Sequence, residues 1–315
     1  MSPLESRSER PIAVLAGSAH PALAEGIARA LEVPLGRSRC ERFPDGEMQV
    51  DVEPASVEGR DVLVVQPTSA PASEHLLELL LLADACRRAG ASSLSAVVPY
   101  FGYARQDRRK RPGEPIGVRV VAQLLATARL ERIITVDPHS DVTEASLDAP
   151  MEKVTAVPLL ARALVERSAH HVGSAVIVAP DLGAAKLARE YAHLLSLPVA
   201  VVHKVRTSGT DVSIERVAGE VRGRRPIIVD DMISTGGTII AAAGAVRAEG
   251  SDGDLIVAAT HAVLVPGALE RLRAGGVREL VVTDTLAPSP SETWTNVVSV
   301  VPLLADVVRR VIRMR

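Results

Sequence analysis

The chain has 315 residues, a length that suggests about two domains, and its apolar fraction of 47% is typical of a globular protein. It has one Trp, three Tyr and two Phe, and 36 basic residues against 38 acidic residues give a net charge of −2. So few rings and so balanced a charge exclude a broad nucleic-acid-binding surface, which needs stacking rings or a basic excess.

Cys40 and Cys86, the two cysteines, are too few for a disulfide framework or a structural zinc site. Residues 1–10 are charged and lack the apolar segment of a signal peptide. No apolar run approaches the ~18 residues that span a bilayer. We therefore expect a cytoplasmic protein that binds neither membrane nor nucleic acid.

Short apolar runs alternate with helical patterns along the chain, which predicts an α/β fold with doubly wound, mainly parallel sheets. The expected strands are Ile12–Leu15, Val62–Val65, Ser95–Pro99, Arg132–Val136, Ala175–Val178, Val199–Val202, Pro226–Val229, Leu255–Ala259 and Glu279–Thr283. The expected helices are Ala22–Leu31, Glu74–Ala89, Val118–Ala126, Val157–Arg167, Ala184–Leu194, Thr238–Ala248, Ala268–Ala274 and Pro302–Ile312.

Two similar domains fit this number of elements. Residues 62–69 and 226–235 both run from an apolar strand into a turn that contains Ser or Thr, and the pattern breaks around Pro150. We expect one domain over residues 8–152 and a second over residues 153–301. In such sheets, ligands bind beyond the carboxyl ends of the strands.

The first segment of interest is Arg42-Phe43-Pro44-Asp45-Gly46-Glu47. Taken alone, Pro-Asp-Gly is good turn chemistry and requires no function.

The second segment, residues 99–110, has three aromatic residues within four positions, at Tyr100, Phe101 and Tyr103. Arg105 and Gln106 are suited to holding phosphates and a purine edge. A solvated basic loop with a small aromatic cluster is the alternative.

Two strand ends carry groups that could bind a metal ion. Asp137-Pro138-His139 follows one strand, and Pro180-Asp181-Leu182-Gly183 follows another. Carboxylate and His on neighbouring strand ends can hold Mg²⁺, directly or through water, when a triphosphate supplies further oxygens. A single His is otherwise most often structural.

Residues 203–209, His-Lys-Val-Arg-Thr-Ser-Gly, leave the strand Val199–Val202 as a polar loop. Lys204 and Arg206 could hold transferring phosphoryl oxygens and neutralise developing charge. An ordinary basic loop would have the same sequence.

The strongest segment is residues 227–238, in which an apolar strand leads to Asp230 and Asp231 and then to Ser234-Thr235-Gly236-Gly237-Thr238. The small residues allow backbone N–H groups at a helix N-terminus to surround a phosphate. The two carboxylates can accept hydrogen bonds from vicinal hydroxyls. The segment therefore predicts a sugar-phosphate site, because consecutive acids at the end of a buried strand are costly without a partner.

Three common nucleotide and hydrolase motifs are absent: the chain has no G-x-x-x-x-G-K-[ST], no G-x-G-x-x-G and no G-x-S-x-G. A P-loop kinase, a dinucleotide-dependent dehydrogenase and an α/β-hydrolase therefore lose support.

Over essentially its full length the chain resembles the ribose-phosphate pyrophosphokinases. The stretch from Asp230 to Thr238 is similar to the phosphoribosyl pyrophosphate motif, which phosphoribosyltransferases share. Residues 42–47, 99–109, 282–285 and 298–305 make the resemblance specific. The resemblance implies transfer of the diphosphoryl group of MgATP to ribose 5-phosphate, giving phosphoribosyl pyrophosphate and AMP for nucleotide, histidine and tryptophan biosynthesis.

The resemblance also implies a type I phosphoribosyltransferase-like fold with the active site between two domains. It implies a dimer-based homo-oligomer, a hexamer in many members, and a C-terminal helix, residues 302–315, that joins the N-terminal domain. By match, the expected ATP-binding residues are Phe43, Asp45, Gly46, Glu47, Arg105 and Gln106. The expected metal-binding residues, for Mg²⁺, are His139 and Asp181, and the expected catalytic residues are Lys204 and Arg206. The expected ribose-5-phosphate-binding residues are Asp230, Asp231, Ser234, Thr235, Gly236, Gly237 and Thr238.

Two departures from the family pattern stand out. Ser234 replaces the Asp of most bacterial members, and Glu144–Asp148 replaces Gln-Gly-Phe-Phe-Asp near a subunit contact, which puts the hexamer and ADP/phosphate regulation in doubt. Ser234 and the Lys204 segment are similar to the archaeal-type subgroup. Two alternatives stay open: a phosphoribosyltransferase, and a catalytically silent homologue that regulates a true synthetase.

Overall fold

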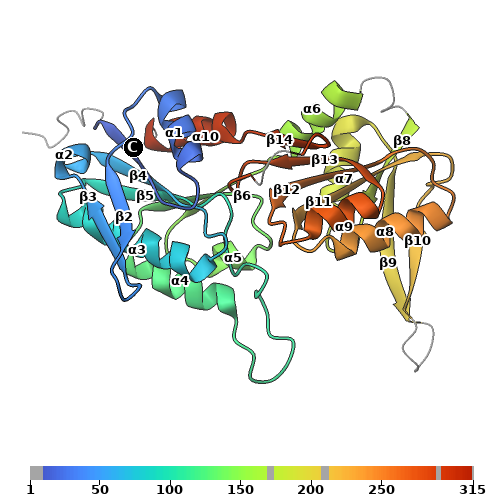
Figure 1. The fold of residues 1–315 in the computed structure, drawn as a ribbon, viewed down its shortest axis with the longest axis horizontal. Coiled ribbons are helices and arrows are strands. Elements are labelled where there is room, and N and C mark those ends of the chain that lie inside the picture. The colour runs from blue at the N-terminus through green and yellow to red at the C-terminus, as the bar shows by residue number, and fades with distance from the viewer. Residues whose placement is uncertain (1–9, 169–173, 207–212, 289–291, 314–315) are drawn as a thin grey trace, which may run out of the picture. The chain divides into compact units, whose positions relative to one another are not determined.

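The computed structural model describes residues 10–168, 174–206, 213–288 and 292–313. It divides into two compact units (Figure 1). Unit 1 comprises the chain up to Val154, Thr285–Ala287 and the residues from Val300 onward. Unit 2 comprises Thr155–Asp284 and Pro288–Ser299. The predicted α/β class with mainly parallel sheets is confirmed.

Unit 1 is built on a five-stranded parallel sheet with the strand order β1-β4-β5-β6-β7. Its strands are β1 (Ile12–Ala16), β4 (Asp61–Val65), β5 (Ser93–Val97), β6 (Arg132–Val136) and β7 (Met151–Val154), and a separate hairpin consists of β2 (Ser38–Arg42) and β3 (Met48–Val52). Its helices are α1 (Pro21–Leu31), α2 (Pro54–Val57), α3 (Ala72–Arg88), α4 (Gly117–Thr127), α5 (Val142–Ala145) and α10 (Val301–Arg313).

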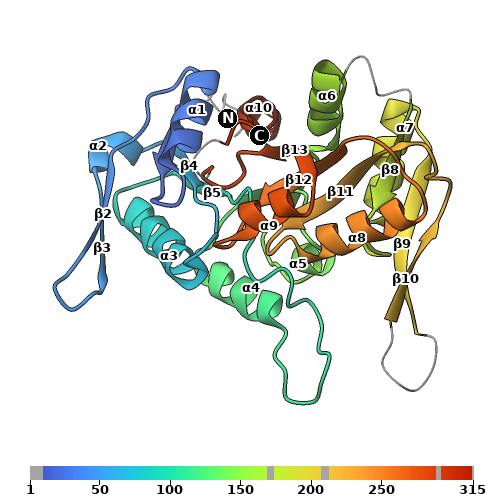
Figure 2. The same cartoon turned by 45° about the vertical axis from the view of Figure 1, so that its right-hand side comes forward.

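Helices cover both faces of this sheet. The steps from β4 to β5 and from β5 to β6 go in the same direction, and right-handed crossovers then place α3 and α4 on one face. That face is a core in which Leu79 and Leu125 pack against strand residues such as Val64. α1 and α10 cover the other face and lie side by side in both views (Figures 1 and 2). A Cβ on Gly26 of α1 would stand only 2.7 Å from Val301 Cγ2, so the missing side chain allows the close approach of α10.

Unit 2 is built on a seven-stranded sheet with the order β10-β9-β8-β11-β12-β13-β14, parallel except for the β9–β10 hairpin. Its strands are β8 (Ala175–Ala179), β9 (Val199–Arg206), β10 (Ser213–Ala218), β11 (Arg225–Ile233), β12 (Leu255–Ala262), β13 (Val277–Thr283) and β14 (Thr295–Val298). Its helices are α6 (Val157–Ser168), α7 (Ala185–Leu195), α8 (Gly237–Ala248) and α9 (Ala268–Ala274).

The strand order of unit 2 reverses at β8. The chain steps from β8 to β9 on one side and then returns to β11 on the other side of β8. α8 and α9 pack on one face through residues such as Ile239, Val246 and Leu272, and α6 and α7 contact the strands of this sheet as well. A ligand is expected at such a reversal, outside the carboxyl ends of the two strands that flank it.

Every predicted strand and helix overlaps an observed one, but five strands were missed: β2, β3, β7, β10 and β14. The strand β2, Ser-Arg-Cys-Glu-Arg, is almost wholly exposed, so it has no apolar pattern that could mark it. Several strands are longer than predicted. Among them, β9 runs to Arg206 and β11 runs to Ile233.

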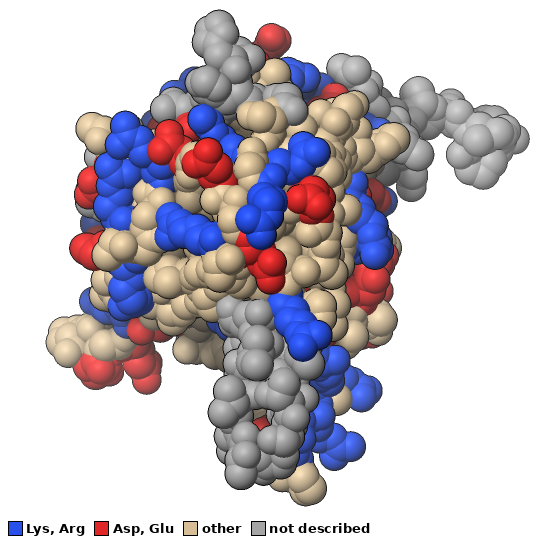
Figure 3. Space-filling view, turned by 90° about the vertical axis from the view of Figure 1, so that its right-hand side faces the viewer, with Lys and Arg blue, Asp and Glu red and all other residues tan. Residues whose placement is uncertain are grey.

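Among the described residues, no helix combines the length and the apolar character needed to cross a membrane. On the face that Figure 3 presents, basic and acidic side chains are interspersed, in keeping with the balanced composition.

Candidate active site

Three carboxylates gather at the strand reversal of unit 2. Asp230 and Asp231 lie near the end of β11, and Asp181 follows the neighbouring strand β8. Burial, the charge of Asp231 and, more weakly, the charge of Asp181 raise the pKa of Asp230 to about 8. A ligand that carries positive charge or donates hydrogen bonds at this position would relieve the repulsion between these carboxylates.

The residues after β11 form a turn that opens α8. Gly236 has the left-handed φ of +80° and is the N-cap residue of the helix, and no side chain caps the helix there. The N–H of Gly237 donates to Thr235 Oγ1 at 3.3 Å. Thr235, Gly237 and Thr238 are exposed, and Ser234 is partly buried. Apart from the Gly237 N–H, the first N–H groups of the helix have no partner within it and are therefore available to an anion.

Gly236 is required by both conformation and space. A Cβ at this position would stand 3.0 Å from Leu272 Cδ2 and 3.1 Å from its Cγ, and Leu272 is a fully buried residue of α9. A larger residue would push the turn away from the core of unit 2.

Asp181 has a structural role as well as its place among the carboxylates. Its Oδ1 accepts a hydrogen bond from the N–H of Ala184 at 3.1 Å, just before α7 begins. One carboxylate oxygen thus fastens the turn, and the side chain is otherwise exposed. Oxygen donors of this kind suit Mg²⁺. In the described part of the chain, however, no three His, Cys, Asp or Glu side chains form a ready metal site, so a metal ion would need further oxygens from a substrate.

In unit 1, the hairpin turn after β2 holds the segment from Phe43 to Glu47. The Phe43 N–H donates to the Glu47 carbonyl at 2.9 Å, and the Gly46 N–H donates to the Phe43 carbonyl at 2.9 Å. Asp45 Oδ1 accepts from the Glu47 N–H at 3.1 Å. The Phe43 ring remains 45% exposed. The turn thus presents a ring and two carboxylates to a ligand.

Arg42 ties this turn to the body of unit 1. Its Nη1 donates to the Gly46 carbonyl at 2.8 Å, and its Nη2 pairs with Glu74 in the first turn of α3. The sequence motif contained Arg42, but its partner Glu74 lies 32 residues away, and no sequence pattern marked that partner.

The loop after β5 carries the second predicted ATP-binding segment. Arg105 and Gln106 are exposed, and the Gln106 side chain lies over Gly117 at the start of α4, where a Cβ would stand 2.3 Å from Gln106 Oε1. The Gln106 carbonyl also accepts from the Val118 N–H at 3.3 Å. The N-terminus of α4 therefore positions this glutamine.

The three aromatic residues of this loop do not act together. Tyr103 is 39% exposed, but Phe101 is only 3% exposed and belongs to the hydrophobic core. Phe101 therefore packs in the core with residues of α3 and α4 and is not available to stack on a base.

The N-terminal turn of α3 lies between the two predicted ATP-binding segments. Glu74 holds the hairpin through Arg42. A Cβ on Gly102 would stand 3.5 Å from the Ala72 Cβ, so the loop after β5 packs on the same helical turn. The two segments, about 60 residues apart in sequence, thus meet at one end of α3.

His139 lies exposed beyond the end of β6, two residues after Asp137, whose φ of +35° is uncommon for a residue with a side chain. His139 belongs to unit 1 and Asp181 belongs to unit 2.

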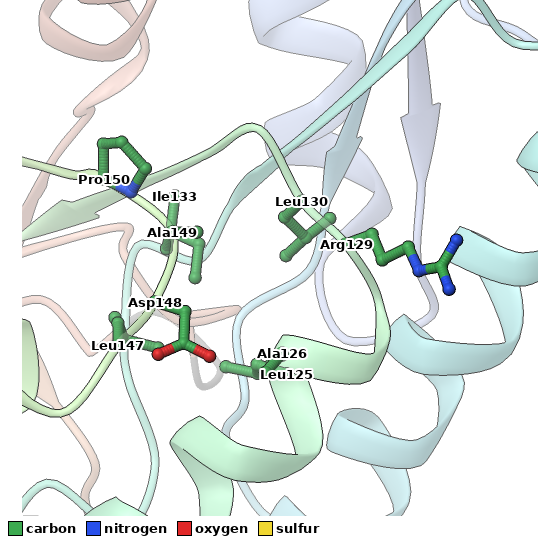
Figure 4. Close-up of a pocket in the computed structure, with 9 residues that line it drawn as sticks. All are labelled: Leu125, Ala126, Arg129, Leu130, Ile133, Leu147, Asp148, Ala149 and Pro150. Atoms are coloured by element: carbon green, nitrogen blue, oxygen red, sulfur yellow. The ribbon is translucent and has the colours of Figure 1, made fainter.

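A cavity of about 180 Å³ lies beside residues 147–148, where the sequence is expected to depart from the family pattern (Figure 4). Leu147 and Asp148 line it from one side. Arg129 also lines the cavity, but its guanidinium points away from the other residues (Figure 4). The remaining lining residues are Leu125, Ala126, Leu130, Ile133, Ala149 and Pro150. Two Phe rings at positions 146 and 147 would need more volume than Ser146 and Leu147 need.

The prediction of a loop directly after residue 202 is wrong. Residues 203–206 continue β9 and pair with β10, with Lys204 opposite Glu215 and Arg206 opposite Ser213. The last three residues of the predicted loop, 207–209, lie outside the described residues. A strand can fix the backbone of Lys204 and Arg206 more firmly than a free loop would.

Comparison with known proteins identifies the family. Residues 12–128 match the N-terminal domain of ribose phosphate pyrophosphokinase, and residues 152–276 match the phosphoribosyl transferase domain. The ribose-phosphate pyrophosphokinase of Clostridium perfringens is 37% identical over 98% of this chain and 96% of its own length. That of Streptomyces avermitilis is 40% identical over 99% and 96%.

A solved structure agrees with these relatives. The phosphoribosylpyrophosphate synthetase of Mycobacterium smegmatis is 38% identical, covers 97% of this chain and 100% of its own, and superposes with a TM-score of 0.89. These relatives are bacterial, and the archaeal-type features stay a prediction from sequence. The sequence identity to these relatives extends over nearly the whole chain, and the carboxylates and the Gly-rich turn lie together at the strand reversal of unit 2. The chain is therefore an enzyme of the ribose-phosphate pyrophosphokinase family.

Proposed function

We propose that the enzyme transfers the diphosphoryl group of MgATP to the anomeric hydroxyl of ribose 5-phosphate. The hydroxyl oxygen attacks the β-phosphorus of ATP, the bond from the β-phosphorus to the oxygen that bridges it to the α-phosphate breaks, and AMP leaves. The products are 5-phosphoribosyl 1-pyrophosphate and AMP. Catalysis of this kind depends mainly on positioning and on neutralising charge at the transferring group.

Ribose 5-phosphate is assigned to unit 2. The N–H groups around Ser234–Thr238 bind the 5-phosphate, since the turn and the start of α8 present donors and a favourable dipole to an anion. Asp230 and Asp231 accept hydrogen bonds from the vicinal ribose hydroxyls. The raised pKa of Asp230 supports this role, because such donors stabilise a carboxylate that burial otherwise disfavours.

ATP is assigned to unit 1. The exposed ring of Phe43 stacks against adenine, while Asp45, Gly46 and Glu47 line the same turn. Arg105 and Gln106 hold the nucleotide from the loop after β5. The support for this site is that both segments pack on the first turn of α3.

Mg²⁺ bound with the triphosphate supplies charge neutralisation at the transferring group. His139 and Asp181 are the residues that would hold it, together with oxygens of the substrate. Lys204 and Arg206 stabilise the charge that develops on the phosphoryl oxygens. Both residues lie in β9, two positions apart, which supports a shared role.

The enzyme acts as a homo-oligomer in this proposal, built from dimers as the family resemblance implies. The predicted cytoplasmic location accords with the reaction, since cells hold ATP in that compartment.

The observation that carries the proposal is that a carboxylate pair in β11 is followed closely by an uncapped Gly-rich turn that opens α8, at the strand reversal of unit 2. A phosphoribosyltransferase would use this turn as well, but it would leave the exposed Phe43 turn of unit 1 without a role. A silent homologue would be expected to lack Lys204 or Arg206, and both are present.

One assay separates these functions. The purified protein is incubated with MgATP and ribose 5-phosphate, and AMP and phosphoribosyl pyrophosphate are measured over a range of Mg²⁺ and phosphate concentrations. We expect the two products in equal amounts. Absence of AMP under all conditions would contradict the proposal, and consumption of added phosphoribosyl pyrophosphate with a free base would favour the phosphoribosyltransferase.

A further inference from the structure

Three successive carbonyl groups of the phosphate turn are held from one side. The Leu264 N–H donates to the Ile233 carbonyl at 2.9 Å, and the Val265 N–H donates to the Ser234 carbonyl at 3.1 Å. Arg271 Nε donates to the Thr235 carbonyl at 3.1 Å. Leu264 and Val265 lie between β12 and α9, and Arg271 lies in α9 itself.

This arrangement determines where the amide groups point. In a trans peptide unit the carbonyl of one residue and the N–H of the next point in opposite directions. Among the described residues the cis peptide is Ala70–Pro71, so the units of this turn are trans. The N–H groups of Ser234, Thr235 and Gly236 are therefore turned away from the α9 side. Consecutive N–H groups that share a direction form an anion-binding concavity.

The holding segment is itself constrained. Leu264 has a φ of +40°, an unfavourable conformation for a residue with a side chain. Gly267, the N-cap of α9, has a φ of +77°. The strained backbone at Leu264 persists because its N–H and that of Val265 are both bonded to the turn. Strain of this kind tends to occur at ligand sites.

Of the three donors, Leu264 and Val265 use their backbone N–H groups, whereas Arg271 uses its side chain. It is exposed, and its guanidinium reaches from the first helical turn of α9 to a carbonyl 36 residues earlier in the chain. A charged donor makes a stronger hydrogen bond to a carbonyl than a neutral one does. The same carbonyl belongs to the peptide unit whose N–H is that of Gly236, the N-cap residue of α8.

We propose that Arg271 is a positioning residue for ribose 5-phosphate, which turns the 235–236 peptide so that its N–H faces the 5-phosphate. The proposal deepens the function proposed above and rests on it for the identity of the sugar phosphate. Arg271 does not touch the substrate in this role. Its loss weakens phosphate binding because the peptide can then rotate, and it leaves the ATP site of unit 1 unaffected.

The test compares Arg271→Ala and Arg271→Lys with Arg273→Ala. Arg273 is a matched control on the same helix: it donates to the carbonyls of Val277 and Arg278 at 3.1 and 3.3 Å and lies over the Trp294 ring, away from the turn. The measurements are the KM for each substrate, kcat, the Tm, and calorimetric binding of ribose 5-phosphate without nucleotide.

We expect Arg271→Ala to weaken binding and raise the KM for ribose 5-phosphate about tenfold, the effect of losing one charge-assisted hydrogen bond. The KM for ATP and the Tm should stay near the wild-type values. Arg271→Lys should recover most of the affinity, since an ammonium can donate to the same carbonyl. Arg273→Ala should bind ribose 5-phosphate like the wild type.

Several results would overturn the inference. Normal AMP formation with an unchanged KM for ribose 5-phosphate in Arg271→Ala would refute the positioning role and leave the proposed function intact. Equal losses in Arg271→Ala and Arg273→Ala, with a lowered Tm, would show a structural effect and refute it as well. Weakened binding in Arg271→Ala, with no AMP formed by the wild type, would support the positioning role and refute the reaction. A wild-type protein that binds no ribose 5-phosphate would overturn both.

Discussion

The backbone N–H of Asp231 donates to Oδ1 of its neighbour Asp230 at 2.9 Å, yet burial and then the charge of Asp231 raise the pKa of Asp230 to about 8. The hydrogen bond therefore only partly offsets the cost of placing two carboxylates side by side at the end of β11. A site of this kind is built for a ligand at the expense of stability.

Asp230→Asn should stabilise unit 2 and impair substrate binding. Because the folded-state pKa is above the unfolded value near 3.8, the wild-type free energy of unfolding falls as pH rises from about 4 to about 8. The variant removes this loss, so its Tm should exceed the wild-type Tm by several degrees at pH 8 and should match it near pH 4. Its KM for ribose 5-phosphate should rise.

The measurement is thermal unfolding from pH 4 to pH 9 without ligands. Asp254→Asn, which changes an exposed carboxylate of the same unit, serves as control and should leave the pH dependence unchanged. A Tm difference for Asp230→Asn that does not vary with pH would contradict the assignment of the shifted pKa.

Gly236→Ala should lose both stability and sugar-phosphate affinity. The new Cβ would stand 3.0 Å from Leu272 Cδ2, and the alanine would have to adopt the left-handed φ of +80°. The expected cost is about 1–3 kcal/mol. Gly244→Ala is the matched control, because Gly244 lies inside α8 with open space around it. That change should stabilise the protein by about 0.5–1 kcal/mol. Urea unfolding and the KM for ribose 5-phosphate check both; a Gly236→Ala variant with wild-type affinity would refute the role of this turn.

Phe43→Ala should raise the KM for ATP about tenfold, since a stacked base contributes about 1–3 kcal/mol. The free energy of unfolding should change little because the ring is 45% exposed. Phe43→Tyr should retain the affinity for ATP. Leu77→Ala, which removes a similarly exposed apolar side chain from α3, is the control, and steady-state kinetics with varied ATP is the measurement. Equal KM values for Phe43→Ala and Leu77→Ala would place adenine elsewhere.

Arg42→Ala should release the hairpin turn from α3. It removes the bond to the Gly46 carbonyl and the pair with Glu74, so we expect the KM for ATP to rise several-fold while stability falls by about 1 kcal/mol or less, as for exposed ion pairs. Arg37→Ala breaks a comparable exposed pair with Glu53 at the other end of the hairpin and should leave the KM for ATP unchanged. If both variants raise the KM for ATP equally, the tether to α3 has no specific role.

Lys204→Ala should lower kcat by about 10²–10³-fold, the usual effect of removing one group that stabilises transition-state charge. The dissociation constant for ATP should change far less. Lys186→Ala on α7 of the same unit is the control and should retain wild-type kcat. A loss of ATP affinity with unchanged turnover at saturation would show that Lys204 binds the ground state only.

The sequence predicted the helices and the parallel strands well because their signals are local. Val62–Val65 and Ala175–Val178 are continuous apolar runs of the kind that buried strands require, and α8 follows the Gly-rich turn at Gly236–Gly237 that opens it. The exposed hairpin strand β2 and the extension of β9 to Arg206 were missed because pairing with a partner strand, rather than an apolar pattern, holds them in place.

By itself, then, the sequence predicted which residues of the phosphate turn and the hairpin turn bind the substrates, since these groups are adjacent in the chain. Only the tertiary structure decided that Phe101 is a core residue, that Glu74 anchors Arg42, and that Arg271 reaches the Thr235 carbonyl. The tertiary structure also sets the pKa of Asp230, through burial and the neighbouring carboxylates. The physical reason is that burial, electrostatic repulsion and hydrogen bonds between distant segments depend on which elements pack together, and no local pattern records that.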